Sequence, residues 1–131
     1  MAKRTRIISP HVTEPPPGRW STCLKIGDTV YVSGLTARGP AGVDGADMYA
    51  QSKAIFAKMK HLVEAAGGVM NDVVKLTIFV TDIARNTEVW KARQEFFTGD
   101  FPTSTLVEIS ALAAPELLVE IEAVAIVGSS V

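Results

Sequence analysis

Apolar and polar positions alternate through the last third of the chain, and this alternation predicts β-strands over residues 103–109 and 117–126. In the second segment Glu120 and Glu122 fall on one face of the strand, because side chains two positions apart point the same way. The opposite face is apolar and consists of Val119, Ile121, Ala123 and Ala125. Carboxylates on so apolar a strand need solvent, a partner or a chemical role, which makes this strand the first candidate for a functional site.

Alternating and β-branched runs predict further strands ahead of these two. They cover residues 4–8, 22–26, 29–33 and 73–80. Gly27 and Asp28 form a turn pair between the second and the third of them, which favours a β-hairpin. The proline-rich residues 13–18 predict an extended loop, and the glycine-rich residues 34–45 predict a flexible one.

Apolar residues recur at helical spacing in two other segments. The first predicted helix follows Asp47, whose side chain is suited to cap a helix N-terminus, and ends at Gly67 and Gly68. The second begins at Asn86 as its cap and runs through Phe97. The predicted order is βββ-α-β-α-ββ, an α+β fold with about six strands in one mixed sheet.

Two helices can cover only one face of such a sheet. The strands over residues 73–80 and 119–126 are too apolar on both sides for a face in water. We therefore expect the second face to pack against other subunits of an obligate oligomer.

Composition narrows the class of protein. At 131 residues, with 47% hydrophobic and 21% charged side chains, the chain is predicted to fold as one domain over residues 1–131. The formal net charge of −1 argues against a nucleic-acid partner, and the apolar runs are too short to span a membrane. Cys23 is the only cysteine, so no internal disulfide forms and a cytoplasmic location is expected. His11 and His61 lie far apart and no zinc-ligand spacing occurs, so no metal site is predicted.

Six short segments follow one another in a characteristic order. They are VYVSG at residues 30–34, EAAGG at 64–68, DVVKLTIFVTD at 72–82, EFF at 95–97, FP at 101–102 and VEIEAVA at 119–125. In this order they resemble the reactive intermediate deaminase family, also called the YjgF or RidA family. The resemblance covers about residues 18–127, nearly the whole chain.

The resemblance implies a chorismate-mutase-like α+β fold and a homotrimer with a small-molecule cleft at each subunit interface. Catalytic members hydrolyse imines and enamines to a keto acid and ammonia, as a 2-iminobutanoate/2-iminopropanoate deaminase does, and they need no cofactor. An arginine clamps the substrate carboxylate, and a glutamate near the carboxy terminus positions and activates the water. Carried over to this chain, that glutamate is Glu120, and the serine of the strand-end Ser-Gly pair is Ser33. We therefore expect Glu120 to be catalytic and Ser33 to contact the substrate.

This sequence departs from the family pattern at four positions where substrate is expected. The arginine of the FPARS pattern is Ser104 here, and a small thiol residue two positions on is Leu106. The tyrosine of an amino-terminal GPY pattern is Trp20, and an asparagine of the second helix is Trp90. A serine hydroxyl cannot reproduce the charge or the fork of a guanidinium, so the usual carboxylate clamp is absent or lies elsewhere.

Three interpretations remain open. In the first, the cleft hydrolyses an imine or enamine whose carboxylate is missing or is held elsewhere, with Arg19 as the first candidate clamp and Arg38 as the weaker one. In the second, the trimer binds a small molecule without catalysis. In the third, Glu120 is the general base of another reaction above an aromatic floor. RNA binding or cleavage suits this slightly acidic chain poorly.

Each candidate also has a plainer interpretation. Glu120 is then a solvated strand residue, Ser33 ends its strand, and Ser104 is an ordinary strand hydroxyl. Trp20 and Trp90 are then packing residues. If both tryptophans face the cleft instead, the site favours a flat or aromatic ligand.

The two carboxylates of the last strand are expected to differ in role. Burial among apolar neighbours is expected to raise the pKa of Glu120, which suits a general base. Glu122 is expected to make a structural contact, with Lys75 or with an arginine on a neighbouring strand.

Overall fold

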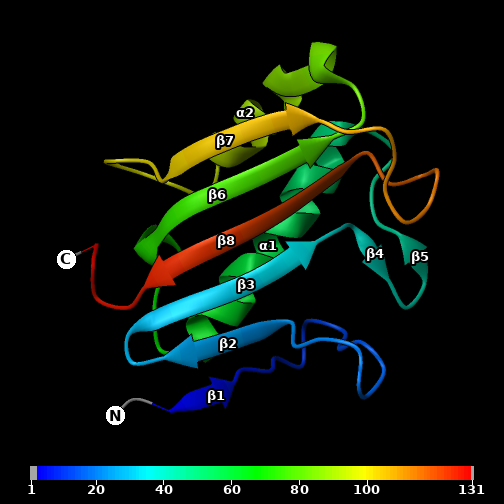
Figure 1. Ribbon diagram of the computed structural model, residues 1–131. Coiled ribbons are helices and arrows are strands. Elements are labelled where there is room, and N and C mark those ends of the chain that lie inside the picture. The colour runs from blue at the N-terminus through cyan, green and yellow to red at the C-terminus, as the bar shows by residue number, and fades with distance from the viewer. Residues whose placement is uncertain (1–2, 131) are drawn as a thin grey trace.

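One mixed β-sheet organises the computed structural model, which describes residues 3–130 (Figure 1). Its strands are β1 (Arg4–Arg6), β2 (Cys23–Ile26), β3 (Thr29–Leu35), β6 (Val73–Val80), β7 (Thr103–Glu108) and β8 (Val119–Ile126). They lie in the order β1-β2-β3-β8-β6-β7, and only β6 and β7 run parallel among the neighbouring pairs of this described sheet. The predicted α+β fold with a six-stranded mixed sheet is therefore confirmed.

Both α-helices lie behind the sheet in Figure 1 and leave its front face uncovered, as predicted. They are α1 (Met48–Ala65) and α2 (Asn86–Gln94). Two short 3-10 helices, η1 (Met70–Asp72) and η2 (Ile83–Arg85), lead into β6 and α2.

The start of α1 is predicted correctly, and the start of α2 is not. The Asp47 carboxylate accepts a hydrogen bond of 2.7 Å from the backbone N–H of Ala50, which caps α1. Asn86 is already helical and caps nothing, because η2 leads directly into α2. The capping carboxylate lies further upstream, where Asp82 accepts a hydrogen bond of 3.0 Å from the N–H of Ala84.

The predicted end of α2 is also corrected, from Phe97 back to Gln94. The chain turns inward after Gln94 and buries Phe97, whose ring meets the ring of Phe56 edge-on at 5.9 Å between centroids. Burying this ring in the core therefore takes precedence over another helical turn.

The core lies between the sheet and the helices. The apolar face of β8 is buried as predicted, since the most exposed of Val119, Ile121, Ala123 and Ala125 is only 5% accessible. These side chains pack in one cluster with the buried α1 residues Ile55, Phe56, Met59 and Leu62. Because one face of β8 is committed to the core, Glu120 and Glu122 must project from the other.

Residues 34–45 are more ordered than the predicted flexible loop. β3 continues to Leu35, and β4 (Arg38–Gly39) then pairs with β5 (Gly42–Val43) in a small second sheet. Gly42 closes the turn with φ of +115°, a conformation that a residue with a side chain rarely adopts. A glycine-rich composition here therefore marks a tight hairpin.

The uncovered face of the sheet carries both apolar and polar side chains. Tyr31 is 49% exposed, and Val107 and Ile126 are each 40% exposed. Lys75 and Thr77 of β6 lie among them on the same face. This face is less apolar than the sequence pattern suggested, and its covering by other subunits stays a prediction.

The expected contact of Glu122 with a neighbouring cation is wrong. The register of β6 and β8 pairs Glu122 with Thr77 and pairs Lys75 with Val124. The ion pairs among residues 3–130 use Glu14 and Glu88 instead.

Candidate active site

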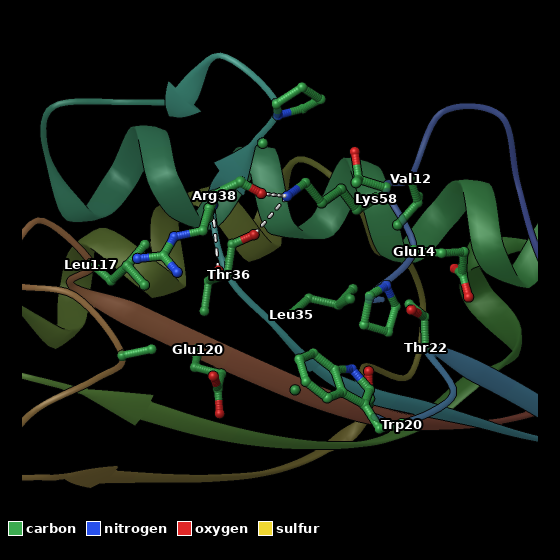
Figure 2. A pocket seen from close by; sticks show the side chains of 17 residues that line it. Val12, Glu14, Trp20, Thr22, Leu35, Thr36, Arg38, Lys58, Leu117 and Glu120 are labelled. Atoms are coloured by element: carbon green, nitrogen blue, oxygen red, sulfur yellow. Dashed lines mark hydrogen bonds between the residues drawn. The ribbon is translucent and has the colours of Figure 1, made fainter. Parts of the chain in front are cut away.

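A cavity of about 360 Å³ opens where β3 ends and β8 begins (Figure 2). Its wall consists of residues 12–15, 33–36 and 38–40 together with Trp20, Thr22, Lys58, Ala113, Leu117 and Glu120. The N-terminal loop, the end of β3, the hairpin and α1 therefore surround the start of β8.

The structure brings only part of the predicted site into this cavity. Trp20, Ser33 and Glu120 line it together, and so does Arg38, the weaker of the two candidate clamps. Arg19 is not part of the wall, although it precedes Trp20 in the chain. Arg38 reaches the wall because the predicted loop is a hairpin that folds back along α1.

The Glu120 carboxylate lies directly against the backbone of Gly34. A Cβ atom built on Gly34 would stand 2.7 Å from Oε2 of Glu120 and 2.9 Å from its Cδ, closer than real contacts allow. Gly34 lies where the pairing of β3 with β8 shifts register, between Val32 and Leu35. The glycine and the irregular strand end together make the space that holds the carboxylate.

The environment of Glu120 raises the pKa of its carboxyl group above the ordinary value. Partial burial is the larger cause, and the nearby negative charge of Glu122 adds to it. The direction agrees with the prediction from sequence. A carboxylate whose pKa is moved toward neutrality is better suited to accept a proton from water.

Ser33 presents a buried hydroxyl that no described residue satisfies. Its backbone N–H donates a 2.9 Å hydrogen bond to the carbonyl oxygen of Thr22, but its Oγ has no hydrogen-bond partner within residues 3–130. A buried hydroxyl without a partner costs on the order of 1–3 kcal/mol. A polar ligand atom in the cavity would remove this cost, which favours the ligand-facing interpretation of Ser33.

Lys58 of α1 fixes the hairpin beside the cavity. Its ammonium donates hydrogen bonds of 2.8 Å to the carbonyl oxygen of Thr36 and 2.7 Å to that of Arg38, as Figure 2 shows. Burial is the main reason that the pKa of Lys58 is lowered. Lys58 therefore holds in place the backbone of the hairpin that carries Arg38.

Two other predicted residues, Ser104 and Trp90, lie at the edge of the sheet. Ser104 faces the helices, because its partner on β6 is the fully buried Leu76. Its hydroxyl accepts a 2.9 Å hydrogen bond from Nη1 of Arg93 on α2. Trp90, 45% exposed, precedes Arg93 by three positions on the same helix. We call Trp90, Arg93 and Ser104 the edge group.

Sequence reasoning did not identify Arg93 as a candidate site residue. One available signal was that it follows Trp90 by about one helical turn, so the two side chains share a helix face. The structure thus places the Arg93 guanidinium of α2 beside Ser104, the residue expected to align with the arginine of the FPARS pattern.

Among residues 3–130 no cluster of three histidine, cysteine, aspartate or glutamate side chains is arranged to hold a metal ion. No helix in the same range is both long and apolar enough to cross a membrane.

Comparison with known sequences gives consistent matches. Residues 12–127 match the family described as Endoribonuclease L-PSP. The chain is also 33% identical over 125 residues to the 2-iminobutanoate/2-iminopropanoate deaminase of Dermatophagoides farinae, covering 93% of this chain and 96% of the relative.

Solved structures share the fold over nearly the whole chain. A protein of unknown function from Pseudomonas aeruginosa superposes with a TM-score of 0.87 at 40% identity, covering 98% of this chain and 95% of that one. The YjgF gene product from E. coli superposes with a TM-score of 0.82 at 30% identity, covering 93% of this chain and 98% of that one.

Proposed function

Because the chain belongs to the YjgF/RidA family, whose sequence family is described as Endoribonuclease L-PSP, we propose that it hydrolyses the C=N bond of a small imine or of an enamine in its imine form. The observation that carries this proposal is the Glu120 carboxylate, placed against Gly34 in a cavity that raises its pKa. The likeness to a 2-iminobutanoate/2-iminopropanoate deaminase supports the substrate class.

Glu120 supplies the proton transfers of this hydrolysis. Its carboxylate takes a proton from water while the water oxygen attacks the carbon of the protonated imine, which gives a neutral carbinolamine. The carboxylic acid then protonates the amine nitrogen, and the resulting carboxylate takes the hydroxyl proton as the C–N bond breaks. The carbonyl product forms, ammonia leaves, and the proton passes from Glu120 to the released ammonia. Ser33 offers its unpaired hydroxyl to the polar groups of the reacting centre.

We propose further that the site is completed between subunits of a homotrimer. Apart from Arg19, the predicted residues either line the cavity or belong to the edge group, and each of these two regions has an exposed tryptophan, Trp20 at 58% and Trp90 at 45%. Contact between the edge group of one subunit and the cavity of the next would cover both rings. The exposed apolar side chains Tyr31, Val107 and Ile126 offer further surface for such an assembly.

We also propose that the protein is cytoplasmic and that its ligand is a small molecule. The buried, unpaired Cys23 suits a reducing cytoplasm, and burial raises the pKa of its thiol to about 12. A net charge of −1 supports a small-molecule ligand over RNA, in spite of the name that the sequence family has. Residues 12–127, which match the family, make up most of the single domain proposed for residues 1–131.

The direct test is the decay rate of imines, measured by competition with semicarbazide. Purified protein should accelerate the decay of at least one imine from a panel of acidic, aliphatic and aromatic amino acids. E120Q, which keeps the side-chain size, should lower kcat/KM by about 100-fold or more, because general acid–base catalysis typically contributes that much.

E122Q is the matched control, since Glu122 is on the same strand and the same face. It should retain most of the activity. No acceleration with any imine, together with retained binding of keto acids, would contradict catalysis and support the alternative of a non-catalytic ligand-binding trimer.

A further inference from the structure

The strand next to β8 places a large apolar side chain directly beside Glu120. In the antiparallel pairing of β6 with β8, the partner of Glu120 is Phe79. Phe79 lies between the fully buried Ile78 and Val80, so it projects from the uncovered face of the sheet, as Glu120 does. Directly opposite residues of an antiparallel pair have their Cβ atoms about 5 Å apart on the same face. The Phe79 ring is therefore the lateral neighbour of the carboxylate on the β6 side.

The other neighbours of Glu120 on this face give it less apolar cover. On the β3 side the neighbour is Gly34, which has no side chain. Two positions away along the chain are Leu118, which packs against the core cluster, and Glu122, which is exposed. Phe79 itself is half-buried. It is thus the large apolar side chain that the sheet sets beside the carboxylate.

The two carboxylates of β8 differ in the side chain that β6 places beside them. The partner of the exposed Glu122 is Thr77, which is small and polar, whereas the partner of Glu120 is an aromatic ring. Partial burial is the main reason that the pKa of Glu120 is raised. An apolar neighbour that keeps water from a carboxylate disfavours its charged form. The Phe79 ring therefore acts in the same direction as the observed burial.

Other charged and titratable groups lie around Glu120. Lys75 is on the same face of β6, but its partner on β8 is Val124. The uncovered face of β3 and the wall of the cavity add Tyr31, Glu14, Arg38 and Lys58. Among the charged groups of residues 3–130, Glu122 is the one whose charge contributes to the raised pKa of Glu120, and its effect is smaller than that of burial. The cover provided by neighbouring side chains is thus the main influence on this carboxylate.

We propose that Phe79 is a positioning residue of the hydrolysis, whose ring covers the β6 side of Glu120 against water and so keeps the carboxylate ready to accept a proton. The inference rests on the proposed function and adds a residue from outside the cavity wall. A stronger general base removes a proton from the attacking water more readily. Gly34 admits the carboxylate on one side, and Phe79 covers it on the other.

The test replaces the ring and follows the pH dependence of kcat/KM. F79T removes the ring but keeps a β-branched side chain that suits a strand. Because the charged form of Glu120 then regains water, its pKa falls and the acid limb should move to lower pH. The plateau of kcat/KM should fall too, by less than the roughly 100-fold loss expected for E120Q. F79L keeps an apolar side chain at this position and should stay close to the wild type in both respects.

Y31T is the matched control for the loss of an aromatic ring. Tyr31 is also on the uncovered face, but its partner on β8 is Val124. Y31T should leave the acid limb at its wild-type position. An equal move of the limb in Y31T and F79T would assign the effect to the face as a whole and overturn the proposal. A limb that stays in place or moves to higher pH in F79T would overturn it as well.

A direct titration keeps this inference separate from the proposed function. The carboxyl carbon of Glu120 can be followed by NMR in protein labelled with carbon-13 at glutamate, with E120Q to assign its signal. The titration midpoint should lie at lower pH in F79T than in the wild type, whether or not any imine is hydrolysed. Equal midpoints would overturn the role of Phe79. A lower midpoint in F79T, with no imine hydrolysed by the wild type, would support the cover by Phe79 and contradict the proposed function alone.

Discussion

The cavity beside β8 and the edge group beside β7 hold different parts of the proposed site. The cavity has Glu120, whose carboxylate lies against Gly34. The arginine of the cavity is Arg38, whose guanidinium makes no hydrogen bond within residues 3–130. The edge has Arg93, which is oriented by Ser104 but has no ion-pair partner in the same range. Each region supplies what the other lacks.

The two exposed tryptophans are divided between these two regions. Trp20 belongs to the cavity wall and Trp90 to the edge group, and neither is buried by its own chain. A large aromatic side chain gains most when it is removed from water, so both rings are suited to an interface or to a ligand. We infer that the working site belongs to the assembly rather than to one chain.

A large effect within the cavity is expected from G34A. The added methyl group would occupy the space of the Glu120 carboxylate, with 2.7 Å between Cβ and Oε2, so the flexible side chain must move away. Displacing a catalytic group by about 1 Å costs roughly 100-fold in rate. We expect kcat to fall by about that factor while the melting temperature stays close to that of the wild type.

G39A provides the comparison for this variant. Gly39 also borders the cavity, but the nearest atom to its added Cβ is the Gly42 carbonyl oxygen at 3.8 Å, an ordinary contact. Its effect on kcat should be far smaller. Equal losses in both variants would show that the hairpin region tolerates no added methyl group and would remove the special role of the Gly34 position.

A smaller effect is expected from the charge next to Glu120. A general base must be ionised, and burial together with Glu122 raises the pKa of Glu120, so the acid limb of kcat/KM should lie above the ordinary value of 4.5. E122Q removes the repelling charge and lowers the pKa of Glu120. The limb should therefore move to lower pH.

The pH profile of the wild type and of E122Q, measured with the same imine, checks this sign. A limb that moves to higher pH in E122Q would mean that Glu122 does not repel the catalytic charge. An acid limb at or below 4.5 in the wild type would mean that burial does not raise the pKa of the working carboxylate.

Sequence patterns predicted the elements whose local signals agree with the fold. The alternation in β8 correctly separated its buried face from Glu120 and Glu122, and β6 has the predicted bounds. Asp47 capped α1 as expected. In each case the pattern of a few neighbouring residues and the demands of the core lead to the same structure.

The errors arose where distant residues decide the local structure. The β4–β5 hairpin depends on Gly42 and on Lys58 of α1, so composition alone suggested a loop and gave Arg38 less weight than Arg19. The hydrogen bond from Arg93 to Ser104 joins a helix to an edge strand, and no periodicity encodes such a contact. The sequence therefore predicted the face of β8 on which Glu120 lies, but not the contact between Arg93 and Ser104.

Complementation between two defective variants tests most directly whether the cavity and the edge group act together across subunits. E120Q and R93Q would be purified separately, unfolded, mixed in equal amounts and refolded, and the decay of an aliphatic 2-imino acid would be measured. In a ring of identical interfaces, about a quarter of all sites in the mixture would combine an intact Glu120 with an intact Arg93. We predict that activity returns to about that fraction of the wild type, whereas a mixture no more active than R93Q alone would contradict a site shared between subunits.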